Sequence, residues 1–493
     1  MVLRNSLKDP LDRPTWSAAI DNPYLHGLHT PVITEATVVD LQADGEIPRD
    51  LYGAYLRIGP NPVFAPPGDY HWFDGDGMVH GLYFRDGKAS YIRKWVKTRA
   101  LAEEIAKAGP QLPGVMGPFD MSAVDASRAH NNDYCKDTGN TDIIWHNRQL
   151  LALWYNAGAV NALDPQTLDT RGQENFCGGL DGTLSAHPKV DRATGELLAF
   201  DYGDFRSDLS YYVFDAAGRL AHKLKIDLPG PRLPHDLAFT THYTILHDFP
   251  LFHDIEALRK TGRRVLNFHR DMPTRYAVVP RYGGAEDVQW FEFEPGYVLH
   301  MVNAWEEGDW IVMDGCFQPD PTIKRDPAEG RLGSMLAYLR YRAHLRRWRM
   351  NVRTGEAHEE QLDDLNVEFC LPDTNLYGVK TRYSYHQLMS EETQTLLFKG
   401  LVKYDHETMT REICDYGPGN YGTESPFAPR EGAQAEDDGY VLTFVTNEDD
   451  FSSYCYVFNA QAIGDGPVAK VRLPLRVPTG FHAKWVPGGD IWP

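Results

Sequence analysis

The chain contains few basic residues for its length. Lys and Arg together number 49 against 69 Asp and Glu, so the 493 residues carry a formal net charge of −20. A protein that holds nucleic acid by its phosphates needs a basic face. The densest basic run, residues 340–349 (RYRAHLRRWR), alternates Arg with Leu and Trp, which is typical of an exposed strand or a solvated surface. The composition therefore argues against a nucleic-acid partner.

Closely spaced cysteines are also lacking. The six cysteines are scattered, and no two of them form a CxxC pair. Such spacing is typical neither of a disulfide framework nor of a thiolate metal site. In so long a chain it fits a reducing compartment.

Long hydrophobic runs are absent as well. No stretch approaches the roughly 20 apolar residues of a membrane-spanning helix. Residues 1–16 (MVLRNSLKDPLDRPTW) lack the apolar core of a secretory signal. We therefore expect a cytoplasmic protein. A peripheral contact with a membrane is compatible with this composition, and nothing in the sequence predicts the oligomeric state.

What the sequence does contain is a series of short β-runs separated by turns. Gly and Asp turns at short, regular intervals predict an all-β fold, and the length favours a propeller over a sandwich. The clearest helical signal is Arg99–Gly109. We expect an N-terminal extension over residues 1–30 and one propeller domain over 31–493. The predicted strands include 54–58, 81–84, 143–146, 150–154, 211–214, 310–313, 337–342, 440–445 and 454–458.

Four of the 19 histidines stand out by their context. Each lies at the edge of a β-like run, beside small or turn-forming residues. Because the inner strands of a propeller converge on its axis, histidines far apart in sequence can meet there. The four are His187, His235, His300 and His482, in the runs 185–189 (SAHPK), 234–240 (PHDLAFT), 299–306 (LHMVNAWE) and 480–485 (GFHAKW).

Several further motifs occur in the same order as in a known family. The sequence resembles the carotenoid cleavage oxygenases, which include apocarotenoid- and stilbene-cleaving enzymes, over nearly its whole length. The runs that carry the resemblance, besides the four histidine contexts, are 22–25 (NPYL), 57–62 (RIGPNP), 70–78 (YHWFDGDGM), 416–419 (YGPG) and 436–440 (EDDGY).

The resemblance implies an all-β, seven-bladed β-propeller with a cap of loops and helices over an axial iron site. It implies Fe(II) bound by the four histidines, and a dioxygenase that cleaves a carbon–carbon double bond with O2 to give two carbonyl products. Imidazole suits Zn, Cu, Fe and Ni, whereas a structural zinc site would include closely spaced Cys. No GxGxxG follows a predicted strand, so the electrons would come from iron and substrate rather than from nicotinamide.

Metal-bound histidines normally donate their second ring N–H to a carboxylate or carbonyl. By resemblance, Glu368 and Glu424 accept two such bonds. Many members of the family carry a third such Glu where this chain has Trp154, Tyr155 and Asn156. We expect Tyr155 or Asn156 to supply a neutral hydrogen bond in its place, to His235.

The substrate is less well defined by the sequence. By family position Phe73 faces the substrate tunnel, and Trp154 is a second candidate for its wall. The Tyr and Lys with which stilbene-cleaving relatives hold a phenol are missing, since residues 114–118 read GVMGP. This favours an apolar conjugated polyene, an apocarotenoid. An aryl alkene remains the main alternative, followed by a propeller that binds carotenoid without catalysis and by an isomerase or hydrolase on the same scaffold.

Overall fold

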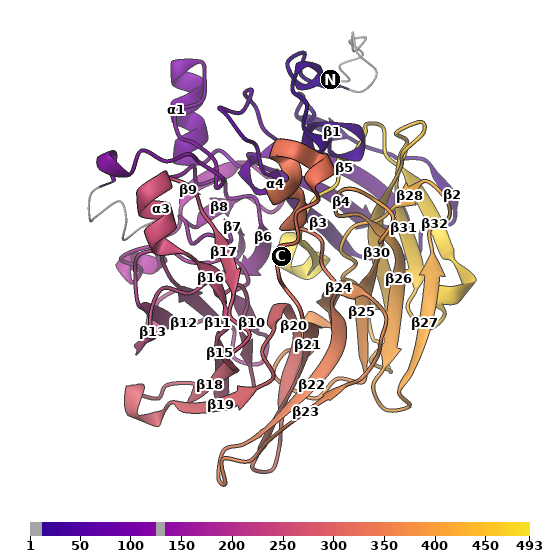
Figure 1. Ribbon diagram of the computed structural model, residues 1–493. Coiled ribbons are helices and arrows are strands. Elements are labelled where there is room, and N and C mark those ends of the chain that lie inside the picture. The colour runs from indigo at the N-terminus through magenta and orange to yellow at the C-terminus, as the bar shows by residue number, and fades with distance from the viewer. Residues whose placement is uncertain (1–11, 125–133) are drawn as a thin grey trace.

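Seven sheets of four or more strands form a ring around a central axis (Figure 1), in a computed structural model that describes residues 12–124 and 134–493. The predicted all-β, seven-bladed propeller is confirmed. The blade that contains β3 consists, from the axis outward, of β33 (Ala483–Pro487), β3 (Gly53–Pro60), β4 (Gly77–Arg85), β5 (Lys88–Trp95) and β1 (Ala36–Val38). The second blade consists of β6 (Asp142–His146), β7 (Gln149–Leu153), β8 (Asn161–Leu163) and β9 (Thr170–Gln173), and the third of β10 (Lys189–Asp191), β11 (Glu196–Asp201), β12 (Asp208–Phe214) and β13 (Leu220–Asp227).

The other four blades complete the ring. They are β14 (Ala238–Phe239), β15 (Tyr243–Asp248), β18 (Thr274–Pro280) and β19 (Gln289–Phe293); β20 (Tyr297–Glu307), β21 (Trp310–Gln318), β22 (His344–Asn351) and β23 (Ala357–Gln361); β24 (Val367–Leu371), β25 (Tyr383–Met389), β26 (Phe398–Asp405) and β27 (Thr410–Asp415); and β28 (Asn420–Tyr421) with β29 (Phe427–Pro429), β30 (Gly439–Asn447), β31 (Ser453–Asn459), β32 (Pro467–Arg472) and β2 (Ala43–Gly45).

Burial differs between the inner and outer strands of a blade. Every residue of β3 is buried, because neighbouring blades cover both faces of the sheet near the axis. The outer strand β13 alternates between exposed and buried positions, as a half-covered strand does. The hydrophobic runs of the sequence are therefore the inner and middle strands.

The ring is closed by strands from both ends of the chain. The C-terminal β33 pairs with β3, with Ala54 opposite Val486, and so becomes the innermost strand of a blade begun near the N-terminus. In the neighbouring blade, β2 pairs with β32. Closure joins the two ends of the chain by backbone hydrogen bonds and leaves the ring without a gap.

Helices and loops cover one end of the propeller (Figure 1). The cap contains α1 (Arg99–Lys107), α3 (Ile255–Thr261), α4 (Gly333–Ala337) and the hairpin of β16 (Leu251–His253) with β17 (Leu266–Phe268), while the short α5 (Gly488–Ile491) follows β33. The predicted helix at Arg99–Gly109 is confirmed by α1. Thr98 accepts a hydrogen bond from Leu101 N at its start, which satisfies a free amide of the first turn.

The described part of the predicted N-terminal extension lies against the cap. Tyr24 and Leu25 are buried, and the Tyr24 ring stacks on Trp72 with 5.6 Å between centroids. Within the ranges described, no helix has both the length and the apolar character that crossing a bilayer requires.

One local prediction was wrong, and another was right only in part. Residues 337–342 form no strand but the end of α4 and a loop of the cap. Residues 344–349 of the basic run form a strand, as predicted, but in β22, a largely buried middle strand, where Arg347 pairs with Asp314 and Arg346 with Glu359. These arginines neutralise carboxylates on adjacent strands, so the run is not a free basic surface.

Candidate metal centre

The four histidines singled out in the sequence meet on the propeller axis. His187, His235 and His482 lie shortly before the inner strands β10, β14 and β33, with His482 immediately before β33, and His300 lies within the inner strand β20. One nitrogen from each lies within 4.8 Å of the others. All four side chains are buried, with 4% to 6% of each residue exposed.

The donor set fits a transition-metal ion. Nε2 of His187 and of His300 is buried without a hydrogen-bond partner among the described residues, which is costly unless another group binds it. Burial lowers the pKa of His187, His235 and His300 well below the usual value for imidazole. These rings are therefore neutral, the form in which imidazole binds metals.

Two of the histidines are held through their side chains by buried glutamates. His300 Nδ1 lies 2.5 Å from Oε2 of Glu368, and His482 Nδ1 lies 3.0 Å from Oε1 of Glu424. With Nδ1–H donated to the carboxylate, Nε2 presents its lone pair to the centre. Burial opposes charge on His482, but the Glu424 carboxylate raises the pKa of this ring. The structure thus brings Glu368 and Glu424 to the positions that the resemblance implied.

The other two histidines are held through the backbone. The amide of His187 donates to Oδ2 of Asp142 over 3.2 Å, while its Nδ1 lies 3.9 Å from the same oxygen, too far for a hydrogen bond. His187 has φ 66°, a left-handed conformation that costs a non-glycine residue about 1–2 kcal/mol. The amide of His235 donates to Nε2 of His247 over 3.4 Å.

The hydrogen bond that we expected from Tyr155 or Asn156 to His235 is absent from the described structure. The Tyr155 and His235 rings are tilted, with 6.3 Å between centroids, and no hydrogen bond joins them within residues 12–124 and 134–493. Asn156 instead accepts from Arg264 and contacts Cys135. Tyr155 lies beside the centre as an aromatic wall.

Two aspartates that the sequence analysis did not identify fix the ligand-bearing segments. Asp142 precedes His187 by 45 residues and lies on the neighbouring inner strand β6. Asp236 follows His235, accepts from the amide of Met301 over 2.8 Å, and pairs with Lys189 at 2.5 Å. It therefore joins the segments of three histidines. In the sequence, the position of Asp236 next to His235 was the only sign of its role, and nothing in the sequence indicated the role of Asp142.

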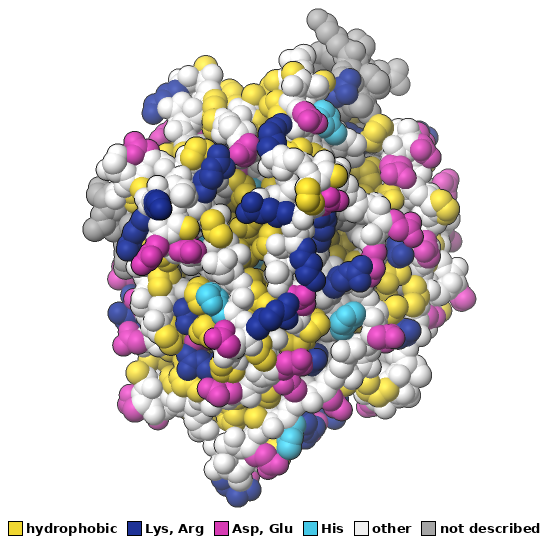
Figure 2. Space-filling view, viewed as in Figure 1, with side chains coloured by type: hydrophobic (Ala, Val, Ile, Leu, Met, Phe, Trp, Pro, Cys, Tyr) yellow, Lys and Arg dark blue, Asp and Glu magenta, His cyan; other side chains and the backbone are white. Residues whose placement is uncertain are grey.

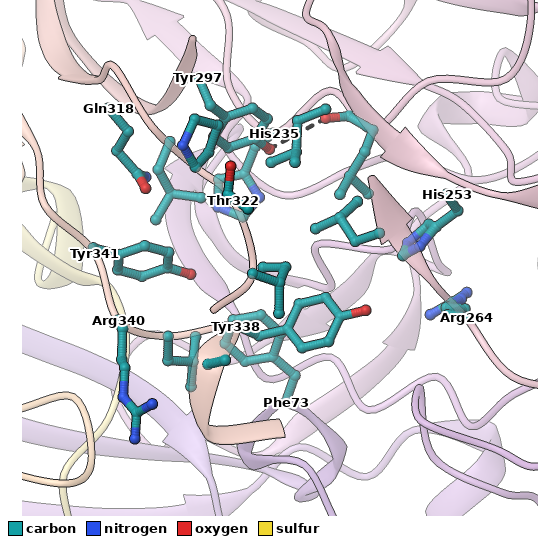
Figure 3. A pocket seen from close by; sticks show the side chains of 18 of the residues that line it. Phe73, His235, His253, Arg264, Tyr297, Gln318, Thr322, Tyr338, Arg340 and Tyr341 are labelled. Atoms are coloured by element: carbon teal, nitrogen blue, oxygen red, sulfur yellow. Dashed lines mark hydrogen bonds between the residues drawn. The ribbon is translucent and has the colours of Figure 1, made fainter. Parts of the chain in front are cut away.

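A largely apolar cavity reaches the centre from the cap side (Figure 3). His235 forms part of its wall, together with Phe73, Tyr155 and leucines of the cap. The loop of residues 337–341 closes one side. In the space-filling view, basic side chains surround a hydrophobic area in the middle of this face (Figure 2). The cavity suits an apolar ligand laid beside His235.

Trp154 does not line this cavity. Its side chain is 1% exposed and packs with Val115, Phe119 and Leu258. Successive side chains of an extended segment point in opposite directions, so Tyr155 faces the cavity and Trp154 faces away from it. Of the two predicted wall residues, the structure brings Phe73 to the cavity and not Trp154.

Fold and site together define a seven-bladed β-propeller whose axis carries four buried histidines able to bind a metal ion. A family model described as retinal pigment epithelial membrane protein matches residues 29–487. The chain belongs to this family, that of the carotenoid cleavage oxygenases.

Particular relatives agree with this assignment. The carotenoid 9,10(9',10')-cleavage dioxygenase of Crocus sativus is 35% identical over 492 residues, covering 94% of this chain and 89% of the relative. The lignostilbene dioxygenase of Pseudomonas brassicacearum superposes with a TM-score of 0.84 at 29% identity, covering 95% of this chain and 99% of that structure. The cobalt-substituted apocarotenoid oxygenase of Synechocystis superposes with a TM-score of 0.80 at 27% identity, covering 93% and 97% of the two chains.

Proposed function

We propose that this protein is an iron(II)-dependent dioxygenase that cleaves a C=C bond of an apolar conjugated substrate, a carotenoid or apocarotenoid. The observation that carries the proposal is the convergence of four buried histidines beside an apolar cavity. The similarity to carotenoid- and stilbene-cleaving enzymes supports the reaction class. Both atoms of O2 enter the two carbonyl products, so no external reductant is needed.

The proposed ligands are His187, His235, His300 and His482. Bound iron(II) would supply the one-electron chemistry that lets O2 react with an alkene. Four neutral imidazoles and no carboxylate ligand would leave the full dipositive charge on the ion, which suits a borderline metal such as iron. Cobalt in a solved relative supports a transition-metal site.

The remaining groups orient the ligands and the substrate. Burial raises the pKa of Glu368 to about 8, and a nearby cation favours its ionised form, which accepts the Nδ1–H of His300. Glu424 acts in the same way on His482. Phe73 and Tyr155, whose rings lie 4.8 Å apart, form an aromatic wall near His235 against which a planar conjugated chain can lie.

The test is metal analysis of anaerobically purified protein, combined with oxygen uptake on an apocarotenal. We expect near-stoichiometric iron, one O2 consumed per alkene cleaved, and loss of both in the His300→Ala variant. His358→Ala removes an exposed histidine, paired with Glu356 at the surface, and serves as the matched control. Tight zinc, or no oxygen uptake on any conjugated alkene, would contradict the proposal.

The second candidate function is the same cleavage on an aryl alkene. It is favoured by the superposition on the lignostilbene dioxygenase. The two are separated by offering a hydroxystilbene beside the apocarotenal at equal concentration. Appearance of aromatic aldehyde without loss of the polyene absorbance would assign the aryl alkene.

A further inference from the structure

The cavity wall is largely apolar and carries polar side chains on two opposite sides. In Figure 3, His253 and Arg264 lie on the side opposite Gln318, Tyr341 and Arg340. His253 ends β16 and Arg264 precedes β17, so a single hairpin of the cap supplies both polar groups. Arg264 is only 7% exposed, whereas the Arg340 side chain is 38% exposed. The cavity therefore opens near Arg340, and the His253 end is the inner one.

Both groups at the inner end keep a polar atom without a partner. Nδ1 of His253 and Nε of Arg264 are buried and have no hydrogen-bond partner among residues 12–124 and 134–493, and Nε2 of Gln318, on the opposite side of the cavity, is a third such atom. A buried donor left unsatisfied costs about 1–3 kcal/mol. A ligand that brings a hydrogen-bonding atom to this end recovers that cost, whereas a purely hydrocarbon ligand does not.

The charges at this end already balance. Arg264 Nη2 lies 2.5 Å from Oδ2 of Asp204 and also donates to the hydroxyl of Tyr134, at 2.9 Å. Asn156 accepts a third bond from the same nitrogen. Burial lowers the pKa of His253 to about 4, so this ring is neutral at physiological pH. One buried cation, one buried anion and one neutral ring leave no net charge for an anionic ligand to neutralise.

We infer that the His253–Arg264 end of the cavity binds an uncharged oxygen, a hydroxyl or a carbonyl, at the terminus of the conjugated substrate. The inference rests on the proposed function and narrows its substrate class. Arg264 Nε–H donates to such an oxygen, and neutral His253 donates or accepts according to its tautomer. The oxygen fixes how far the chain enters, and hence which double bond lies beside His235.

Two other kinds of substrate end are disfavoured at this site. A hydrocarbon end leaves both polar atoms unsatisfied, and sites built for a hydrogen bond discriminate strongly against analogues that lack it. A carboxylate or phenolate end brings a second negative charge to an arginine that Asp204 already neutralises, and burying an uncompensated charge is costly. The expected order of affinity is hydroxyl or aldehyde, then hydrocarbon, then carboxylate.

The experiment measures equilibrium binding of a matched polyene series to the iron-loaded protein under anaerobic conditions, by quenching of tryptophan fluorescence. The members share one conjugated chain and end in CH3, CH2OH, CHO or COOH. We expect the alcohol and the aldehyde to bind about tenfold more tightly than the hydrocarbon, and the acid to bind more weakly than the alcohol. Equal affinities, or tightest binding of the acid, would overturn the inference without any variant.

Two variants locate the oxygen. His253→Phe keeps an aromatic ring but removes both nitrogens, and we expect it to reduce the preference for the alcohol to less than about threefold. Thr322→Val, which removes a hydroxyl elsewhere in the cavity wall, is the control and should keep the wild-type preference. An unchanged preference in His253→Phe, or its loss in Thr322→Val, would place the oxygen elsewhere. Thermal unfolding of each variant verifies the fold.

Because binding is measured without turnover, this result is independent of the reaction. A protein that prefers the alcohol but consumes no O2 with any alkene would support the inference while contradicting the proposed function. A protein that consumes O2 with a conjugated alkene but binds all four members with equal affinity would do the opposite.

Discussion

The four histidines form two pairs that are held in different ways. His300 and His482 each have a glutamate on Nδ1, which fixes both the rotation of the ring and its tautomer. His187 and His235 have no carboxylate within hydrogen-bond distance of the ring among the described residues, and instead their backbone amides are bound by Asp142 and His247. One pair is oriented by its side chains, the other by the position of its backbone.

The difference shows how four histidines can be held in place with only two carboxylates bound to their rings. Four ring carboxylates would bring four buried anions around a dication, and each buried charge carries a desolvation cost. Two glutamates would balance the charge of the proposed dication. The backbone anchors then fix the remaining ligands without adding charge at the ring nitrogens. Holding His187 by its backbone has an energetic cost, because this residue adopts an unfavourable left-handed conformation with positive φ.

The largest expected effect is the loss of bound iron when a histidine is replaced, and it should be the same for both pairs. His187→Ala and His300→Ala each remove a proposed ligand, so we expect bound iron to fall more than about 100-fold, beyond the effect of losing an outer partner. Elemental analysis after anaerobic purification measures it. If only one of the two variants retained iron, the histidine replaced in it would not be a metal ligand. The two pairs would then differ in metal binding as well as in how they are held.

A smaller effect should appear at the glutamates. Glu368→Gln and Glu424→Gln keep the shape of the side chain but remove its charge, so we expect iron affinity to fall about 10–100-fold. Competition with a chelator of known affinity measures the change. Glu307→Gln, at a surface carboxylate paired with Lys380, is the control. Wild-type affinity in both glutamate variants would remove the proposed role of the side-chain anchors.

Asp142→Asn should affect iron affinity less than either glutamate substitution. The retained amide oxygen can still accept from His187 N at the position of Oδ2, and only the bond that Ile143 N donates to Oδ1 is lost, so we expect a loss of less than about threefold. The same chelator competition provides the measurement. A loss as large as that of Glu424→Gln would mean that Asp142 acts through its charge on the ring, and the distinction between the pairs would fail.

The smallest expected effect is that of Tyr155→Phe. The sequence alone predicts lower iron content or turnover for this variant, whereas the structure gives Tyr155 an aromatic contact with Phe73 and no hydrogen bond to His235 among the described residues. We expect unchanged iron content and a change in KM within about threefold, because the ring remains in the wall. Iron analysis and steady-state oxygen uptake distinguish the two expectations.

The comparison also shows what the sequence can and cannot predict. The four histidines and the two glutamates lie in recognisable runs, and the propeller follows from short strands and turns together with the resemblance. Asp142 could not be found in this way, because it reaches His187 only when β6 and β10 become neighbouring inner strands. Trp154 and Tyr155 are adjacent in sequence, and only the direction of the backbone decides which ring faces the cavity. The apolar run 337–342 looks like a strand because the cap buries apolar side chains as a sheet does.

The strand that closes the ring also carries consequences for biosynthesis. His482 directly precedes β33, the last strand of the chain, and its partner strand β3 lies near the N-terminus. During translation, the blade that contains β3 therefore lacks its innermost strand until the other six blades have been synthesised. A nascent or prematurely terminated chain lacks the fourth histidine and the closed ring together. We therefore expect the complete set of four proposed ligands to assemble only when the ring closes.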